Sequence, residues 1–464
     1  MENITWKTAI WNLSWGDIDS KNYNVEGNCH FSGERGAFLN IPFGDLSRTR
    51  QLLETGQYTG NLEAPRFPFL YGITQDGTRL VLCDALSVGS GFSTPGSSYE
   101  NIEAATVLSA KYDIDPTALI TSLDFELEFL KEWIGVTYQS SNNRSIVLDL
   151  EKQHKSILLS SSQDSKVELR YGMDYFQNTT SQLTIPYHCY LHVEYSSGLP
   201  LDEIWNNDVW NLRAMFAFFF GSYPSITWAK AYFENSKLPV EIFRASSIAR
   251  PNKKITNRCP ISFSASTQSK LARIWRAWQN FNDDERLASQ VLTSLLGDWE
   301  MPLDLFFIAS TTMLESLARS RSKDCLTEDE FKIISKPIMK AADSSIKNRL
   351  QGLLGLLKYP SYSMLLDAIY EEGKPWSEHL IQDWKNFRTT QITLRHSGAH
   401  GIKNTNQHLL IYNHYQAQIV LAYIIFMIRL GFTEKEIESF ENSNFMNASR
   451  WRIRQQYRKE VTVT

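Results

Sequence analysis

The fold of the N-terminal half is decided by one stretch, FLYGITQDGTRLVL at residues 69–82. Two apolar runs flank the dipeptide Asp76-Gly77, and both of these residue types tolerate a positive φ angle. Asp-Gly between apolar runs is a strong signal for a β-hairpin. Residues 66–86 are therefore predicted to form two antiparallel strands joined by a tight turn.

Short segments on both sides of this hairpin also have the composition of strands. In Leu123–Phe129 the apolar residues occupy every second position, which is the period of a half-buried strand. Breaks rich in serine and asparagine separate the segments. Many short strands with polar turns predict a β-sandwich or an open barrel. The other expected strands are 37–43, 103–112, 145–150, 156–160, 167–171 and 184–195, and an amphipathic helix is expected over 201–221.

The C-terminal half has the periodicity of helices. Residues 268–281 place Leu271, Ile274, Trp275 and Trp278 on one helical stripe. Short links between such segments favour an antiparallel helical bundle. Further helices are expected over 287–296, 302–319, 346–357, 362–371, 377–394 and 406–430.

One helix start carries its own signature. Thr327 and Glu330 have the spacing of a capping box. The helix that follows should be brief or kinked, because Pro337 lacks a backbone donor. The predicted fold class is α+β and multidomain: a β-rich region over 1–240, a basic linker over 241–266 and a helical region over 267–464.

Composition limits the classes of protein. A chain of 464 residues suggests two or three domains. An apolar content of 42% excludes a disordered chain, and a net charge of −4 means that any nucleic acid must bind a local patch. The five cysteines are far apart in the sequence, which favours reduced thiols over disulfides or a zinc site.

The sequence also indicates where the protein works. No secretion signal opens the chain, and the longest apolar run, Ile419–Leu430, includes Arg429 and is too short to span a membrane. A soluble, cytoplasmic protein without membrane contact is expected.

The hexapeptide RHSGAH at residues 395–400 has the composition of a phosphate-handling site. A guanidinium offers a fixed fork of donors to phosphate oxygens, and a histidine exchanges protons near neutral pH. On a continuous helix Arg395 and His400 would diverge by about 140°. Gly398 and Gly401 are expected to end or loosen the helix so that both side chains face one groove. The alternative is an arginine that binds helix-end carbonyls and a histidine packed in a turn.

This hexapeptide resembles the Arg-x4-His motif of the HEPN superfamily of helical ribonucleases. In that family the position after the arginine is usually Asn, Asp or His, and here it is His396. The motif is expected in the link before the last long helix. The resemblance implies a metal-independent endoribonuclease that needs no cofactor and uses the 2′-hydroxyl of its substrate. It gives Arg395 and His400 the catalytic roles, with His396 orienting the substrate or supporting His400.

Two further residues could support that site. Glu315 and Arg319 lie one helical turn apart and resemble a Glu-x3-Lys/Arg pair near the groove of some HEPN proteins. A solvated surface pair is the alternative.

The N-terminal half resembles the β-rich domain of the ApeA family of bacterial anti-phage proteins. The resemblance rests on the hairpin at 69–82 and on the segment SLDFEL at 122–127 with Glu132-Trp133. In that family the β-rich domain precedes a HEPN domain, and this chain has the same order. The resemblance implies a sensing or regulatory N-terminal domain and a ribonuclease that acts in anti-phage defence by abortive infection.

The resemblance also implies partners. HEPN domains pair, so a composite site in a homodimer or higher oligomer is expected. The other expected partners are RNA, either tRNA or another structured RNA, and a trigger derived from phage.

Two basic stretches could bind RNA. One covers 242–282 and has no acidic residue; the other lies beside Trp451 and Tyr457, whose rings could stack unpaired bases. A solvated linker and tail explain both equally well. The candidate RNA-binding residues are Lys253, Lys254, Arg258, Arg450, Arg452 and Arg454.

His188 and His192 share one face of an expected strand, but no third ligand stands nearby and no metal site is expected. Two other functions stay open. One is a HEPN domain without catalysis that serves as an RNA-binding, ligand-binding or regulatory module; full occupancy of the Arg and His positions argues against it. The other is a two-domain carbohydrate- or ligand-binding protein in which the motif is a coincidence.

Overall fold

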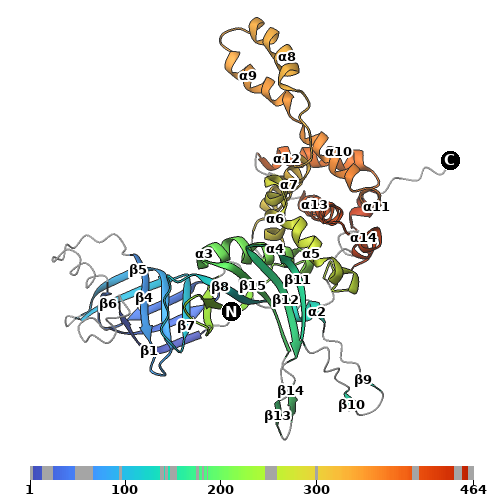
Figure 1. Cartoon of the computed structure of the whole chain (residues 1–464). Coiled ribbons are helices and arrows are strands. Elements are labelled where there is room, and N and C mark those ends of the chain that lie inside the picture. Colours follow the sequence, from blue (N-terminus) through green and yellow to red (C-terminus); the bar gives the residue numbers. More distant parts are fainter. Residues whose placement is uncertain are drawn as a thin grey trace. The chain divides into compact units, whose positions relative to one another are not determined.

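A computed structural model divides the chain into two units (Figure 1). The β unit comprises Met1–Arg213, Pro224–Ile255 and Phe263–Ala272, and the helical unit comprises Ala214–Tyr223, Thr256–Ser262 and Arg273–Thr464. The predicted division into a β-rich N-terminal half and a helical C-terminal half is confirmed. The structure describes residues 4–12, 25–46, 66–93, 97–135, 140–141, 145–146, 154–173, 177–179, 182–184, 187–245, 259–297, 301–399, 407–443 and 452–457.

The described strands of the β unit pair mainly in one antiparallel sheet of 13 strands, in the order β11-β12-β15-β8-β16-β17-β7-β5-β4-β1-β2-β3-β6. Two short hairpins, β9 with β10 and β13 with β14, pair separately. The strands are β1 (Ile4–Asn12), β2 (Val25–Ser32), β3 (Gly36–Ile41), β4 (Arg66–Ile73), β5 (Arg79–Ser93), β6 (Ser97–Ala104), β7 (Thr106–Ala110), β8 (Ile120–Leu127), β9 (Ser140–Ser141), β10 (Ser145–Ile146), β11 (His154–Ser161), β12 (Ser165–Met173), β13 (Gln177–Thr179), β14 (Gln182–Thr184), β15 (Tyr187–Leu199), β16 (Ile226–Phe233) and β17 (Val240–Arg244).

Six of these strands close into a barrel, because β6 pairs with β3 on one side and with β5 on the other. The interior is filled by buried apolar side chains, among them Phe31, Leu39, Leu70 and Ile102. The predicted hairpin is confirmed as β4 and β5, with Gly77 at a φ of +80° in its turn. The structure thus has a closed barrel where the sequence left a sandwich or an open barrel as alternatives.

The long strand β5 joins the barrel to the open part of the sheet. Its first residues, up to Cys83, pair with β7, and its later residues, from Leu86, pair with β6. Asp84 lies between the two pairings and has a φ of 50°, in the left-handed region. The strand therefore changes partner at a local break in its extended backbone.

The open part of the sheet has one apolar and one polar face. Leu123, Phe125 and Leu127 occupy alternate positions of β8 as predicted, but Asp124 and Glu126 between them are also buried, so the strand is not half-buried. The strand expected over 123–129 is too long, because Phe129 has a φ of 70° and caps the short helix α2 (Leu130–Ile134). The expected helix over 201–221 consists of α3 (Leu201–Ile204), the π-helical turn η3 (Trp205–Val209) and α4 (Trp210–Phe220).

Helices α5 to α14 follow in the chain, and all but the first residues of α5 belong to the helical unit. Helix α7 contacts α6, α10, α12 and α13 and is the centre of the bundle. The apolar helix α13 is long enough to cross a membrane by length and composition, but 72% of its apolar window is buried, as in a core helix. The bounds are α5 (Ala265–Gln279), α6 (Asp283–Leu295), α7 (Leu303–Arg319), α8 (Glu328–Ala341), α9 (Lys347–Gly355), the 3-10 turn η4 (Leu356–Lys358), α10 (Tyr362–Glu372), α11 (Trp376–Leu380), α12 (Trp384–Ala399), α13 (His408–Arg429) and α14 (Glu434–Glu441).

The capping box at Thr327 and Glu330 is confirmed, since each side chain bonds the backbone N–H of the other residue. The helix that it opens is 14 residues long and passes through Pro337, so it is not brief. Proline removes the hydrogen bond to the carbonyl of Ile333, and Ile333 is 72% exposed, so water can solvate that carbonyl.

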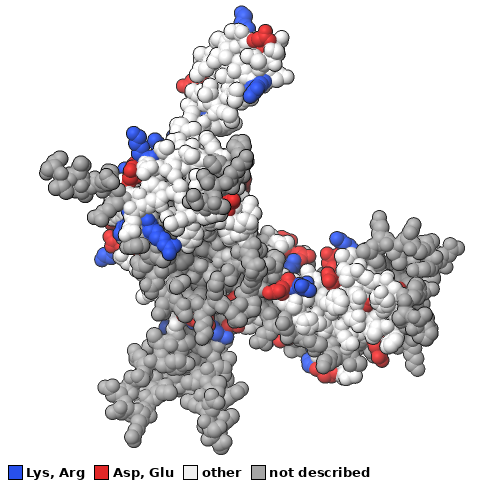
Figure 2. Space-filling view, turned by 180° about the vertical axis from the view of Figure 1, so that it is seen from behind, with Lys and Arg blue, Asp and Glu red and all other residues white. Residues whose placement is uncertain are grey.

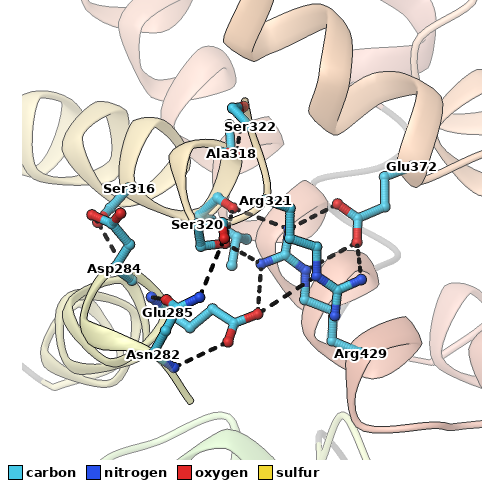
Figure 3. A network of polar contacts seen from close by, with 11 residues as sticks. Asn282, Asp284, Glu285, Ser316, Ala318, Ser320, Arg321, Ser322, Glu372 and Arg429 are labelled. Atoms are coloured by element: carbon cyan, nitrogen blue, oxygen red, sulfur yellow. Dashed lines mark hydrogen bonds and ion pairs between the residues drawn. The ribbon is translucent and has the colours of Figure 1, made fainter. Parts of the chain in front are cut away.

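A buried ion network joins four helices of the bundle (Figure 3). The side chain of Arg429, only 1% exposed, binds Glu285 at 3.0 Å and Glu372 at 2.8 Å. It also donates to the hydroxyl of Ser320 (2.7 Å) and to the carbonyl of Leu317 (3.0 Å). Every polar group that Arg429 brings into the interior therefore has a partner, which is the condition for a buried charge to be tolerated.

Candidate functional site

Arg395 lies on the last turns of α12, which extends to Ala399. The prediction that the helix ends at residue 394 and that the motif lies in a link is therefore wrong. Gly398 lies inside the helix and does not end it. A single glycine costs a helix only about 1 kcal/mol relative to alanine. His396 is exposed on the same turn. His400 lies outside the described residues.

The guanidinium of Arg395 is held between two other helices. Its Nη2 donates to Glu315 Oε2 of α7 at 2.7 Å. Its central carbon lies 4.2 Å from the ring centroid of Tyr362, which belongs to α10. An ion pair on one side and a cation–π contact on another restrict the guanidinium to one orientation.

Glu315 also binds the second predicted supporting residue. Its Oε1 accepts from Arg319 Nη2 at 2.8 Å, one turn further along α7. The structure therefore brings Glu315, Arg319 and Arg395 together, although Arg395 is 80 residues from Glu315 in the sequence. Arg319 is 57% exposed, as in the solvated pair that the sequence left as an alternative, but Glu315 also binds Arg395.

The charge of this cluster favours an anion. Two guanidinium groups share one carboxylate, so a net positive charge remains. The side chains of Arg395 and Arg319 are 38% and 57% exposed, against 21% for Glu315. Among the described residues Glu315 binds only one nitrogen of Arg395, which leaves other N–H groups of this five-donor side chain for water or for an anionic ligand.

The aromatic ring of Tyr362 packs against the guanidinium of Arg395, and its hydroxyl is uncharged. Burial raises the pKa of its hydroxyl to about 12. The hydroxyl accepts from Gln391 Nε2 at 3.2 Å, and the same nitrogen lies 3.3 Å from Thr311 Oγ1. Gln391 lies one helical turn before Arg395, so the polar contacts continue from the surface into the core.

His414 ends this chain of contacts in the core. Its Nδ1 lies 2.7 Å from Gln391 Oε1, and its Nε2 contacts the hydroxyl of Tyr457. Because Gln391 donates through its nitrogen, its oxygen is the acceptor and Nδ1 of His414 carries the proton. Burial lowers the pKa of His414 to about 3, so the imidazole is neutral. Sequence analysis missed His414, Gln391 and Tyr362; the spacing of Gln391 and Arg395 on one helical face was the available signal.

The described residues of the C-terminal basic cluster are Arg452 and Arg454. Arg452 is exposed and lies 6.0 Å from the ring of Tyr412, and Arg454 donates to the carbonyl of His379 at 2.7 Å. Tyr457 is 3% exposed, so the prediction that its ring stacks on a base is wrong: it packs in the core against His414. Lys253, Lys254, Arg258, Arg450 and Trp451 lie outside the described residues.

A comparison with protein families identifies the N-terminal part of the chain. The model of the family described as ApeA N-terminal domain 1 matches residues 7–278, which is more than half of the chain. The chain belongs to this family. No curated protein and no solved structure matches the chain.

The match confirms the predicted resemblance to ApeA and makes the chain an ApeA-like protein of anti-phage defence. The ApeA N-terminal domain 1 match ends within α5, and the cluster around Arg395 lies C-terminal to it. The match therefore covers most of the β unit and only the first segments of the helical unit, and it does not bear on the chemistry at Arg395.

Within the ApeA N-terminal domain 1 region, His192 belongs to a buried polar row across the sheet. Its Nδ1 lies 2.5 Å from Asp124 Oδ1 in β8, and Glu168 of β12 is its neighbour on the other side. His188 packs its ring against Tyr190 at 5.8 Å. Among the described residues no group of three or more His, Cys, Asp or Glu is placed to hold a metal ion.

Proposed function

We propose that this ApeA-like protein is an endoribonuclease whose helical unit is a HEPN domain, controlled by its N-terminal domain. The observation that carries the proposal is the fixed, partly exposed guanidinium of Arg395. Glu315 and Tyr362 orient it, and Arg319 adds a second positive charge beside it. An oriented guanidinium with a second positive charge beside it can bind a phosphate and stabilise the charge that develops on the phosphate oxygens.

The reaction would proceed through the RNA's own 2′-hydroxyl. The hydroxyl loses its proton and its oxygen attacks the adjacent phosphorus, while the bond from phosphorus to the 5′-oxygen breaks. A 2′,3′-cyclic phosphate forms, and the leaving 5′-oxygen takes up a proton. His400 would move these protons, and Arg395 would stabilise the phosphoryl oxygens. His396, exposed beside Arg395, would orient the substrate or support His400.

Glu315 and Tyr362 would act as positioning residues through their contacts with Arg395. Two such sites related by a twofold axis would supply more cationic and proton-transferring groups than one chain has, so the active form would be a dimer or a higher oligomer. The substrate class would be tRNA or another structured RNA in the cytoplasm, and a phage component would release the control by the N-terminal domain.

A non-catalytic RNA-binding module is the second candidate. The observation that favours it is the ion pair of Arg395 with Glu315, which already occupies part of the guanidinium. Such a module would bind the same RNA and leave it intact.

One experiment separates the two functions. Purified wild-type protein, Arg395→Ala and His400→Ala are incubated with total tRNA, and the ends of the products are analysed. Lys385→Ala is the matched control, because it removes an exposed positive charge from the same helix. The nuclease predicts cyclic-phosphate ends and a loss of about 10²–10⁴ in rate for both site variants. Each protein is assayed alone and with an extract of phage-infected cells, which supplies the trigger. Binding without cleavage by the wild type under both conditions, or unchanged cleavage by both site variants, would contradict the nuclease.

A further inference from the structure

Helices α8 and α9 form a hairpin that has almost no core of its own. They lie side by side (Figure 1), and they contact each other. The hairpin is closed at its base, where the N–H of Cys325 donates to the carbonyl of Lys358 at 2.8 Å. Helix α8 has no buried residue, and α9 has only Leu354. The apolar residues of both helices are therefore left without the packing that normally stabilises an amphipathic helix.

This hairpin exposes a dense set of large apolar side chains. Eight of them lie between residues 333 and 359, and each is 39–72% exposed. An exposed apolar surface of this extent on a soluble protein commonly marks a binding site. Figure 2 shows that the hairpin has few charged side chains on the face in view. The eight are Ile333, Ile334, Ile338, Ile346, Leu353, Leu356, Leu357 and Tyr359.

The extent of this surface suits a protein interface. A stable interface buries about 800 Å² on each partner. Eight large side chains of which 39–72% is exposed can supply most of such an area.

The charges of α8 indicate which partner fits. The first turn is acidic, with Glu328, Asp329 and Glu330, and the rest of the helix carries Lys332, Lys336 and Lys340 without an acidic residue. Two copies of α8 that run antiparallel would place the acidic turn of each beside the lysines of the other. Asp329 has a side chain that is 92% exposed and lies 3.8 Å from Lys332 of the same helix, and Glu328 binds Lys358, whereas Lys336 and Lys340 form no ion pair with any described residue. The helix is therefore complementary to itself.

We propose that the α8–α9 hairpin is a self-association arm that pairs with the same hairpin of a second copy. The eight apolar side chains of each arm would form the core of a four-helix bundle, and the charges of α8 would fix the antiparallel direction. A membrane surface is the rival partner, but interfacial helices carry mainly basic residues on their polar face, and the acidic first turn of α8 does not fit that pattern. The arm does not depend on the proposed ribonuclease activity.

The test is sedimentation velocity of the full chain over a range of micromolar concentrations. The variant Ile333→Glu/Leu353→Glu/Leu356→Glu should weaken self-association by at least about 100-fold, since three charges enter the core of the interface. The control Leu287→Glu/Leu305→Glu has side chains that are 45% and 50% exposed on α6 and α7, and it should associate as the wild type does. Circular dichroism checks that all three proteins are folded.

A second pair of variants tests the antiparallel direction. Lys336→Glu/Lys340→Glu makes both ends of α8 acidic, and Glu328→Lys/Asp329→Lys leaves Glu330 as the one acidic residue beside two lysines, so the first turn becomes net positive. Each variant alone should associate more weakly than the wild type, and a mixture of the two should recover association. Recovery is the result that a membrane-binding helix cannot give.

Three results would overturn the proposal: a wild type that is monomeric throughout, equal association of the arm and control variants, or charge variants that do not recover on mixing. Binding of the wild type to phosphatidylglycerol vesicles without self-association would assign the hairpin to membranes instead. If chains also pair at the Arg395 site, the wild type should reach a tetramer and the arm variant should stop at a dimer. Sedimentation therefore tests the self-association arm, and analysis of the tRNA products tests the nuclease, so either proposal can fail without the other.

Discussion

Glu315 of α7 and Arg395 of α12 are joined by an ion pair of 2.7 Å between Glu315 Oε2 and Arg395 Nη2. The carboxylate has two effects on the guanidinium. It removes part of the charge that would attract RNA, and it fixes the direction in which the remaining donors point. Substitution of Glu315 separates these effects. Without the negative charge of Glu315, the site should bind RNA more tightly. Without the fixed orientation of Arg395, the rate of cleavage should fall.

Under the proposed ribonuclease function, Glu315→Gln should lower kcat for RNA cleavage by about 10–100-fold, since a small misplacement of a catalytic group has effects of that size. KM should not rise, because the variant is more positive at the site. Steady-state kinetics on a labelled tRNA give both constants. Glu371→Gln, an exposed carboxylate on α10, is the control and should leave both unchanged. A rise in KM with normal kcat would mean that Glu315 does not position Arg395.

The ring of Tyr362, and not its hydroxyl, should matter for activity. Tyr362→Phe keeps the cation–π contact with Arg395 and should cleave at nearly the wild-type rate. It should lose about 1 kcal/mol of unfolding free energy, because the amide of Gln391 loses a buried partner. Tyr362→Leu removes the ring, and its cleavage rate should fall further than that of the Phe variant. Equal activity of the two variants would contradict the role of the ring.

Much of the β unit could be predicted because its signals are local. The hairpin at 69–82 depends on a turn and on the residues beside it. The barrel strands β1 and β2 were missed, and so were β16 and β17, although these last two lie in the middle of the sheet. At two of its core-facing positions β16 has Ala229 and Ala231, which are small and give a weak apolar pattern. Its partner β8 lies about a hundred residues earlier in the chain, so no local pattern reveals the pairing.

The candidate site could be predicted only in part for the same reason. Arg395 and His396 were found from a short motif, and the sequence also singled out the pair Glu315 and Arg319. That Glu315 contacts Arg395 could not be predicted, because packing of α7 against α12 creates the contact. Tyr362 and His414 belong to no motif: only packing of the helices brings the ring of Tyr362 to Arg395 and His414 to Gln391.

The buried imidazole of His414 should make the helical unit sensitive to acid. Burial lowers its pKa to about 3 in the folded protein, below the ordinary 6.5 of an unfolded chain. Between these two values the unfolded state binds a proton that the folded state does not, so the unfolding free energy falls as the pH is lowered from about 6.5 toward 3. The slope from this group approaches about 1.4 kcal/mol per pH unit. At higher pH the group contributes no pH dependence.

Urea denaturation at several pH values between 7 and 4 checks this prediction. His414→Gln cannot take up the proton, so the difference in stability between wild type and variant should shrink as the pH falls. Other titrating groups act on both proteins and cancel. A difference that stays constant with pH would show that the imidazole does not resist protonation in the folded state.

Arg429 should be the most costly single residue to remove from the ion network of Figure 3. Arg429→Met would leave Glu285 and Glu372 without their closest cation at a site where the arginine is 1% exposed. Breaking a buried ion pair in this way costs about 3–5 kcal/mol. The matched control is Arg321→Met, since Arg321 contacts the same two carboxylates at 3.7 and 3.3 Å but has a side chain that is 54% exposed. An exposed pair of this kind contributes about 0–1 kcal/mol.

The triple variant Glu285→Gln/Glu372→Gln/Arg429→Met decides why Arg429 is costly to lose. It removes the arginine together with the charges that the arginine neutralises. The Glu285→Gln change keeps an oxygen acceptor for the N–H of Asn282, which Glu285 binds at 3.3 Å in the capping box. If the cost of Arg429→Met comes from unpaired carboxylates, the triple variant should regain most of the lost stability. Denaturation followed by far-UV circular dichroism measures the unfolding free energy of Arg429→Met, Arg321→Met and the triple variant relative to the wild type. A triple variant as unstable as Arg429→Met would mean that packing of the arginine side chain, and not charge, holds α6, α10 and α13 together.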